Sequence, residues 1–145
     1  MRAVSRITRC CFRRSERPLV VRVLLVEDND VYRSTLELLL DGRDGLEIVG
    51  SVAAGDEAAA AATVLDPDVV LMDFRLPGLD GAGATSAVLA ASPRAAVICL
   101  TAEATDADRL AVLAAGAVGL VEKGSSIEDL VQTIRSANQR GEPDP

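Results

Sequence analysis

From residue 20 onwards, short apolar runs alternate with segments in which apolar residues recur every three or four positions. The runs are nearly continuous, which is typical of parallel strands covered on both faces. They span residues 20–26, 46–52, 68–73, 95–100 and 117–121. The helical periods predict five helices, over residues 31–40, 55–66, 81–91, 106–115 and from about 125 onwards.

The predicted helices carry recognisable signals at their ends. Acidic residues within 27–30 lie at the start of the first helix, where negative charge interacts favourably with the positive end of the helix dipole. Residues 125–129 resemble a capping box at the start of the last helix. Pro67 and Pro93 end the second and third helices. Because strand-helix-strand passages are right-handed, this alternation predicts an α/β fold: a doubly wound, five-stranded parallel sheet with five helices distributed over both faces.

The chain is long enough for one domain. Its 145 residues are 49% hydrophobic, which supplies a real core. We expect a domain over residues 19–139, a basic and disordered extension over 1–18, and a linker-like tail over 140–145. Two alternatives for residues 1–18 stay open: an arm that binds nucleic acid or an anionic membrane, or translation that begins near Val20.

Composition excludes several functions. There is no histidine, so histidine catalysis and histidine metal sites are ruled out. Six arginines and one acid precede Pro18, which leaves nine basic and 21 acidic residues in the remainder of a chain of net charge -7. So acidic a domain repels the phosphates of nucleic acid, and we expect no direct DNA binding.

The cysteines and the lengths of the apolar runs indicate the compartment. Cys10, Cys11 and Cys99 are odd in number and form no disulfide framework, which suits a reducing cytosol. No apolar run approaches the roughly 18 residues of a membrane span. We therefore expect a cytoplasmic protein without a membrane segment.

Chemically reactive side chains follow four of the five predicted strands. Glu27 and Asp28 follow the first strand, Asp73 ends the third, Thr101 follows the fourth and Lys123 follows the fifth. The carboxyl ends of parallel strands meet at one edge of the sheet, where ligands bind in such folds. Three carboxylates, a hydroxyl and an ammonium group are therefore expected to converge.

This group of side chains suits phosphoryl transfer. Clustered carboxylates repel one another unless a cation compensates, and Mg2+ keeps coordination positions open for phosphate oxygens. Asp73 is then the in-line nucleophile, while Lys123 and Thr101 bind the equatorial oxygens of the phosphoryl group. Each residue also has a simpler reading: a helix-dipole partner for Glu27 and Asp28, a strand-end β-branched residue for Thr101, and a solvated surface lysine for Lys123.

Residues 20–138 resemble the receiver domain of bacterial two-component response regulators, which has a flavodoxin-like fold. Four motifs carry the resemblance, in the same order and at the same strand positions. They are Glu27-Asp28, residues 72–81 around Asp73, Thr101-Ala102, and Lys123 after residues 114–117. Lys123 is also the only lysine of the chain, which otherwise uses arginine.

The resemblance implies a role for each motif residue. Asp73 is the phosphoacceptor and also a metal ligand, Asp28 is a direct Mg2+ ligand, and Glu27 is a mostly water-mediated one. The backbone carbonyl of Arg75 is a further metal ligand. Residues that bind the phosphoryl group and respond to it are Thr101, the backbone amide of Ala102, and Lys123.

The same resemblance implies partners. The phosphoryl group comes from a sensor histidine kinase or a phosphotransfer protein. The output surface is the fourth helix, fifth strand and fifth helix, about residues 106–138, which binds a downstream protein or a second copy of the chain. Such a receiver is modified once and assists its own phosphorylation and dephosphorylation, rather than turning over a substrate as an enzyme does.

Two positions depart from the family pattern. Leu120 stands at the switch position where receivers usually carry Tyr or Phe, three residues before Lys123. Gly124 follows Lys123 where many relatives have proline. The second departure resembles the subgroup that continues into a DNA-binding helix-turn-helix domain, which is absent from these 145 residues. We expect a stand-alone receiver.

Two other functions remain as alternatives. The first is a Mg2+-dependent hydrolase similar to the haloacid-dehalogenase type, which also uses a strand-end aspartate. Enzymes of that type share a second aspartate two residues after the first, and this chain has Arg75 at that position, which argues against this function. A degenerate receiver that acts as a phosphorylation-independent interaction module is favoured by Leu120 and the short chain.

Overall fold

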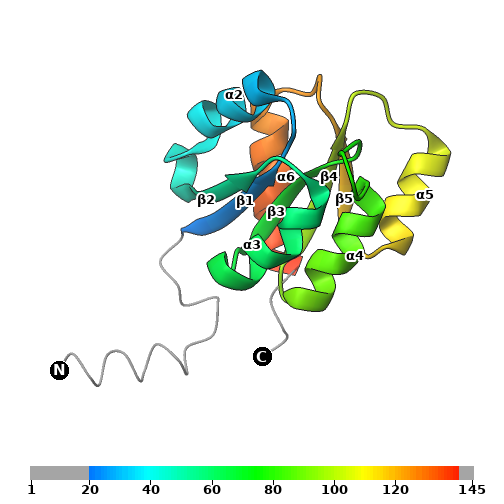
Figure 1. The fold of residues 1–145 in the computed structure, drawn as a ribbon. Coiled ribbons are helices and arrows are strands. Elements are labelled where there is room, and N and C mark those ends of the chain that lie inside the picture. The colour runs from blue at the N-terminus through cyan, green and yellow to red at the C-terminus, as the bar shows by residue number, and fades with distance from the viewer. Residues whose placement is uncertain (1–19, 141–145) are drawn as a thin grey trace.

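Five parallel strands form one sheet in the order β2-β1-β3-β4-β5, and helices cover both of its faces (Figure 1). The computed structural model describes residues 20–140. The strands are β1 Val21–Val26, β2 Leu46–Val52, β3 Val69–Asp73, β4 Ala96–Thr101 and β5 Gly119–Glu122. The helices are α2 Asp30–Leu40, α3 Ala58–Leu65, α4 Gly81–Ala91, α5 Asp106–Ala114 and α6 Ile127–Arg140, with short 3-10 turns at Arg43–Gly45 and Gly55–Glu57. The predicted α/β architecture is confirmed.

Both faces of the sheet are buried, which explains why the strands are apolar throughout. Successive residues of β1 point to opposite faces: Val23 and Leu25 contact one cluster, Leu24 and Val26 the other. The first cluster lies between the sheet and the helices α2 and α6, and the second lies beneath α3, α4 and α5 (Figure 1). Each fully buried Val or Leu side chain contributes about 1.5–3 kcal/mol relative to an exposed one.

The helices begin where short polar side chains cap them. Asn29, Asp80, Thr105 and Ser126 each accept a hydrogen bond from a backbone N–H in the first turn of α2, α4, α5 and α6, respectively. The first helix therefore starts at Asp30, one residue before the predicted position.

The fourth and fifth strands are shifted towards the carboxyl end relative to the prediction. The N–H of Ala117 bonds to the carbonyl of Val112, so this residue belongs to the turn after α5 and the last strand begins only at Gly119. At the other end, the N–H of Lys123 donates to the carbonyl of Thr101 at 2.7 Å. Pairing therefore continues up to Lys123, and Thr101 is the last residue of β4 rather than the first after it.

Arg22 interrupts the apolar run of β1 because it caps a neighbouring helix. Its guanidinium donates to the backbone carbonyls of Leu65 and Asp66 at the end of α3. These carbonyls have no partner within the helix, and a cation is favourable at that end.

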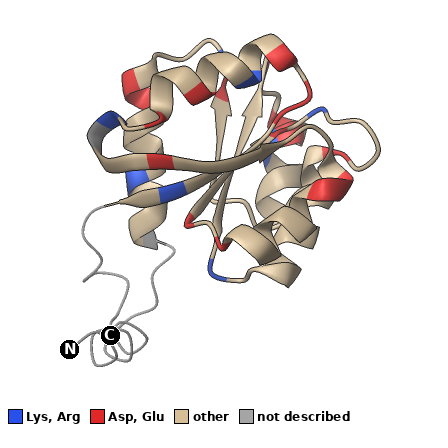
Figure 2. Cartoon of the chain, turned by 60° about the vertical axis from the view of Figure 1, so that its left-hand side comes forward, with Lys and Arg blue, Asp and Glu red and all other residues tan. Residues whose placement is uncertain are grey.

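The expected extension over residues 1–18, with Cys10 and Cys11, lies outside the described residues, as do positions 141–145 of the expected tail. Arg140, expected in that tail, is the last residue of α6. Within residues 20–140, acidic positions outnumber basic ones (Figure 2). None of the helices in this range is long and apolar enough to cross a membrane.

Candidate functional site

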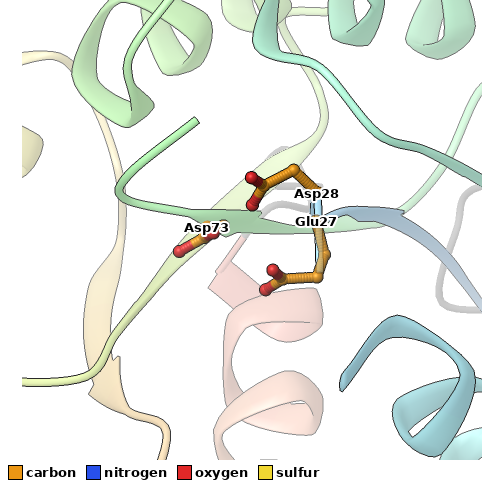
Figure 3. Close-up of side chains that lie close together, drawn as sticks. All are labelled: Glu27, Asp28 and Asp73. Atoms are coloured by element: carbon orange, nitrogen blue, oxygen red, sulfur yellow. The ribbon is translucent and has the colours of Figure 1, made fainter. Parts of the chain in front are cut away.

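Four strand ends bring the predicted site residues together at the carboxyl edge of the sheet. β1 and β3 are neighbours, so Glu27 and Asp28, directly after β1, lie beside Asp73 at the end of β3. Figure 3 shows the side chains of Glu27 and Asp28 leaving the end of β1 on the side where Asp73 lies. Lys123 directly follows β5, the strand at the end of the sheet beyond β3 and β4.

The three carboxylates form a compact acidic cluster. One oxygen from each of Glu27, Asp28 and Asp73 lies within 4.8 Å of the others. Glu27 is 1% exposed and Asp73 5%, whereas Asp28 is exposed to solvent. Oxygen ligands at this spacing suit a hard divalent cation such as Mg2+, which accepts a few carboxylates and keeps waters in its other positions. The donor set therefore fits the predicted metal.

Glu27 is held in place by the residues that follow it. Its Oε2 accepts the N–H of Asn29 at 3.0 Å, and the guanidinium of Arg33 donates to its backbone carbonyl at 2.7 Å. Arg33 is in turn paired with Asp30 at 2.5 Å. The start of α2 thus fixes the position of the buried Glu27 carboxylate. A carboxylate that only interacted with the helix dipole would remain at the surface.

Lys123 bridges the two buried carboxylates. Its Nζ lies 3.0 Å from Oε1 of Glu27 and 3.3 Å from Oδ1 of Asp73, and its side chain is 24% exposed. Burial by itself lowers the pKa of this ammonium, but the hydrogen bond to Glu27 and the two negative charges outweigh burial and raise it. Lys123 is therefore a charged member of the site and not a solvated surface lysine.

The surroundings of Asp73 displace its pKa. Burial first, and then the negative charge of Glu27, raise the pKa of Asp73 from 3.8 to about 6. The charge of Lys123 and the backbone N–H of Arg75, 3.4 Å from Oδ1, act in the opposite direction without cancelling these effects. The site is therefore electrostatically strained near neutral pH, and a bound cation would relieve that strain.

This strain predicts a pH-dependent gain in stability for Asp73→Asn. Between pH 3.8 and about 6 the folded protein holds a proton on Asp73 that the unfolded chain releases. The wild type therefore loses stability as pH rises through this window, by about 3 kcal/mol in total. Urea denaturation without Mg2+ should show the variant more stable by about that amount at pH 7.5. The difference should disappear near pH 4, and a constant difference would contradict the prediction.

The hydroxyl of Thr101 is hydrogen-bonded to the backbone of Glu103. Thr101 is 2% exposed, its Oγ1 donates to the carbonyl of Glu103 at 3.2 Å, and the N–H of Glu103 approaches the same oxygen at 3.4 Å. Ala102 follows β4 directly and is exposed. The phosphate-binding roles of Thr101 and Ala102 stay predictions.

Leu120, the non-aromatic switch residue, is half-buried on β5. It packs against the apolar cluster beneath α3, α4 and α5. Arg75 exposes its side chain, and its N–H contacts Asp73; the metal-ligand role of its carbonyl stays a prediction.

A glycine closes the loop that carries Asp73. The N–H of Gly81 donates to the carbonyl of Phe74 at 2.9 Å, and a Cβ at position 81 would lie 2.6 Å from the Cα of Phe74. Only glycine permits this approach, so the loop over residues 74–80 returns tightly and α4 starts beside the site. The Asp80-Gly81 pair in the predicted motif therefore has a structural role.

Sequence reasoning missed two side chains beside the site, Arg33 and Tyr32. The ring of Tyr32 lies under Lys123, with Nζ 4.7 Å from the ring centroid. A signal was present, because residues in the first turn of a helix lean back towards its N-terminus and here towards the strand ends.

A doubly wound parallel sheet that carries an acidic cluster and a lysine at its carboxyl edge indicates the class of protein. Residues 23–135 match the family model of the response regulator receiver domain, and the chain belongs to this family. The chain is 39% identical over 116 residues to the response regulator GacA of Pseudomonas viridiflava, covering 80% of this chain and 54% of that protein. It is 33% identical over 124 residues to the transcriptional regulatory protein LiaR of Bacillus subtilis, covering 86% and 58%. The chain thus spans little more than half the length of these relatives.

Solved structures agree with this assignment. A two-component response regulator of the LuxR family from Aurantimonas matches with a TM-score of 0.79 and 31% identity, over 83% of this chain and 86% of that chain. The receiver domain of a sensor histidine kinase from Pseudomonas aeruginosa, with a magnesium ion coordinated in its active-site cleft, matches with a TM-score of 0.73 and 34% identity, over 83% and 98%.

Proposed function

We propose that this receiver accepts a phosphoryl group on Asp73 and thereby switches a protein-interaction surface. The observation that carries the proposal is the position of Lys123, whose ammonium lies 3.3 Å from Asp73 and is also ion-paired with the buried Glu27. A cation there can bind an oxygen of a phosphoryl group on Asp73.

The chemistry is a single displacement at phosphorus. A carboxylate oxygen of Asp73 forms the new P–O bond, and the bond between phosphorus and the donor's leaving group breaks, with its electron pair going to that group. Mg2+, held by Asp28 and Asp73 with Glu27 nearby and the carbonyl of Arg75, supplies charge neutralisation when bound. Lys123 holds a phosphoryl oxygen, and the amide of Ala102 and the hydroxyl of Thr101 complete the contacts once that hydroxyl turns from Glu103.

We infer that the donor is a sensor histidine kinase or a phosphotransfer protein in the cytoplasm, in keeping with the family. The output surface is α5, β5 and α6, and it binds a downstream protein or a second copy of the chain. The phosphorylation-independent module remains a second candidate on one observation: Leu120 places no aromatic ring at the switch position.

Phosphorylation by a small donor tests the proposal. The wild-type protein, incubated with Mg2+ and acetyl phosphate, should gain the mass of one phosphoryl group, and chelation of Mg2+ should prevent the gain. Intact-mass spectrometry measures both. A folded protein that gains no adduct at any Mg2+ concentration would favour the phosphorylation-independent module.

A further inference from the structure

Tyr32 is the only tyrosine of the chain, and its ring lies against Lys123, the only lysine. It is the third residue of α2, and its N–H donates to the Oδ1 of Asn29, the cap of that helix, at 2.8 Å. Its ring is half-buried and packs against the apolar cluster between the sheet and the helices α2 and α6. The cap and the packing together fix where the ring lies.

The ring supplies the third contact of the Lys123 ammonium. Glu27 and Asp73 attract Nζ from the acidic cluster at 3.0 and 3.3 Å, and the ring centroid lies 4.7 Å away. A cation at this distance from an aromatic ring is attracted by the quadrupole of the ring. Lysine has a long, flexible stem, so each fixed contact narrows the positions that its ammonium occupies.

No other aromatic ring of the described residues is available for this contact. Position 120, which faces the other side of the sheet, is leucine. Phe74 packs against the cluster on that same opposite face. The aromatic contact of the site therefore comes from the first turn of α2 and not from β5.

We propose that Tyr32 is a positioning residue for Lys123: its ring holds the ammonium at Asp73, where the phosphoryl group arrives. This rests on the proposed function of Asp73 as phosphoacceptor. The contact also links α2 to the state of the site, because any movement of Nζ towards a phosphoryl oxygen changes its position relative to the ring.

The composition of the chain allows a direct spectroscopic test. Protein grown with 13C-labelled lysine carries one labelled side chain, so the ε-methylene group gives a single, unambiguous NMR signal. In the wild type without phosphoryl donor, ring currents should displace the ε-proton signal from its position in a free lysine side chain. Tyr32→Leu should return the signal towards the free position, and Tyr32→Phe, which retains the ring, should restore the displacement.

The rate of phosphorylation by acetyl phosphate supplies the functional readout. Tyr32→Leu should slow adduct formation about three- to tenfold, the size expected for one partly desolvated cation–π contact. Tyr32→Phe should restore the wild-type rate, which shows that the ring and not the hydroxyl acts. In a Lys123→Met background, Tyr32→Leu should cause no further slowing, because a positioning residue acts through the lysine.

The outcomes separate the two proposals. An unchanged lysine signal or an unchanged rate in a folded Tyr32→Leu protein would overturn the positioning role. Equal slowing with and without Lys123 would also overturn it, since it would show a merely structural effect. If the wild type takes up no phosphoryl group, the proposed function is wrong. The NMR signal of the Lys123 ε-methylene group would then decide by itself whether Tyr32 holds Lys123.

Discussion

The Asp73→Asn protein is expected to gain no phosphoryl group under conditions in which the wild type gains one. The amide that replaces the carboxylate is uncharged and is not a nucleophile towards phosphorus, so the P–O bond cannot form. The loss should be complete on the timescale of wild-type saturation, and intact-mass spectrometry with acetyl phosphate and Mg2+ measures it. Because the same substitution is expected to stabilise the fold at neutral pH, unfolding will not account for the loss.

Asp80→Asn is the matched control for this experiment. Asp80 lies at the other end of the same loop, and its Oδ1 caps α4 by accepting the N–H of Gly83 at 2.8 Å. Asparagine caps helices about as well as aspartate, so this variant should remain folded and take up the phosphoryl group like the wild type. An adduct that persists in Asp73→Asn, or disappears in Asp80→Asn, would assign the acceptor to another residue.

Replacement of Lys123 by methionine is expected to cause the largest loss of stability. Glu27 is 1% exposed, and the ammonium 3.0 Å away is its charged partner; without it, the negative charges of Glu27 and Asp73 face each other in a buried site. Removal of one partner from a fully buried ion pair costs about 3–5 kcal/mol, and we expect about 2–4 here because Lys123 is partly exposed. Urea denaturation at pH 7.5 without Mg2+ measures this loss.

The loss should respond to charge in two further measurements. It should shrink as pH falls towards 5, where the wild-type Asp73, with a pKa of about 6, is already largely protonated. It should also shrink when Mg2+ is added, because the cation replaces part of the missing positive charge. Glu27→Gln in the Lys123→Met background should recover part of the stability.

Arg43→Met provides the contrast. Arg43 pairs with Glu128 at 2.9 Å, but the two side chains are 35% and 70% exposed. Loss of such a surface pair changes stability by about 1 kcal/mol or less. If Lys123→Met were no more destabilising than Arg43→Met, the electrostatic description of the site would be wrong.

Local patterns account for the parts of the fold that the sequence predicts well. Apolar runs and helical periods placed the five strands and five helices, because periodicity reflects which faces of an element are buried. The strand-end positions of Glu27, Asp28, Asp73 and Lys123 followed from the same pattern, since parallel strands deliver their carboxyl ends to one edge. The boundaries of β4 and β5 were shifted because hydrogen bonds between distant segments, such as that from Lys123 to Thr101, decide how far the pairing extends.

The sequence by itself thus determined the fold class, the edge that carries the site and the residues gathered there. Only the tertiary structure decided how those side chains meet. Lys123 bridges Glu27 and Asp73 and lies against the ring of Tyr32, and these contacts join elements whose relative positions depend on strand order and packing. The hydroxyl of Thr101 bonds to Glu103, two residues away, through a rotamer that the sequence does not specify. Periodicity places a residue on a face, whereas side-chain rotamers and neighbouring elements decide what it touches.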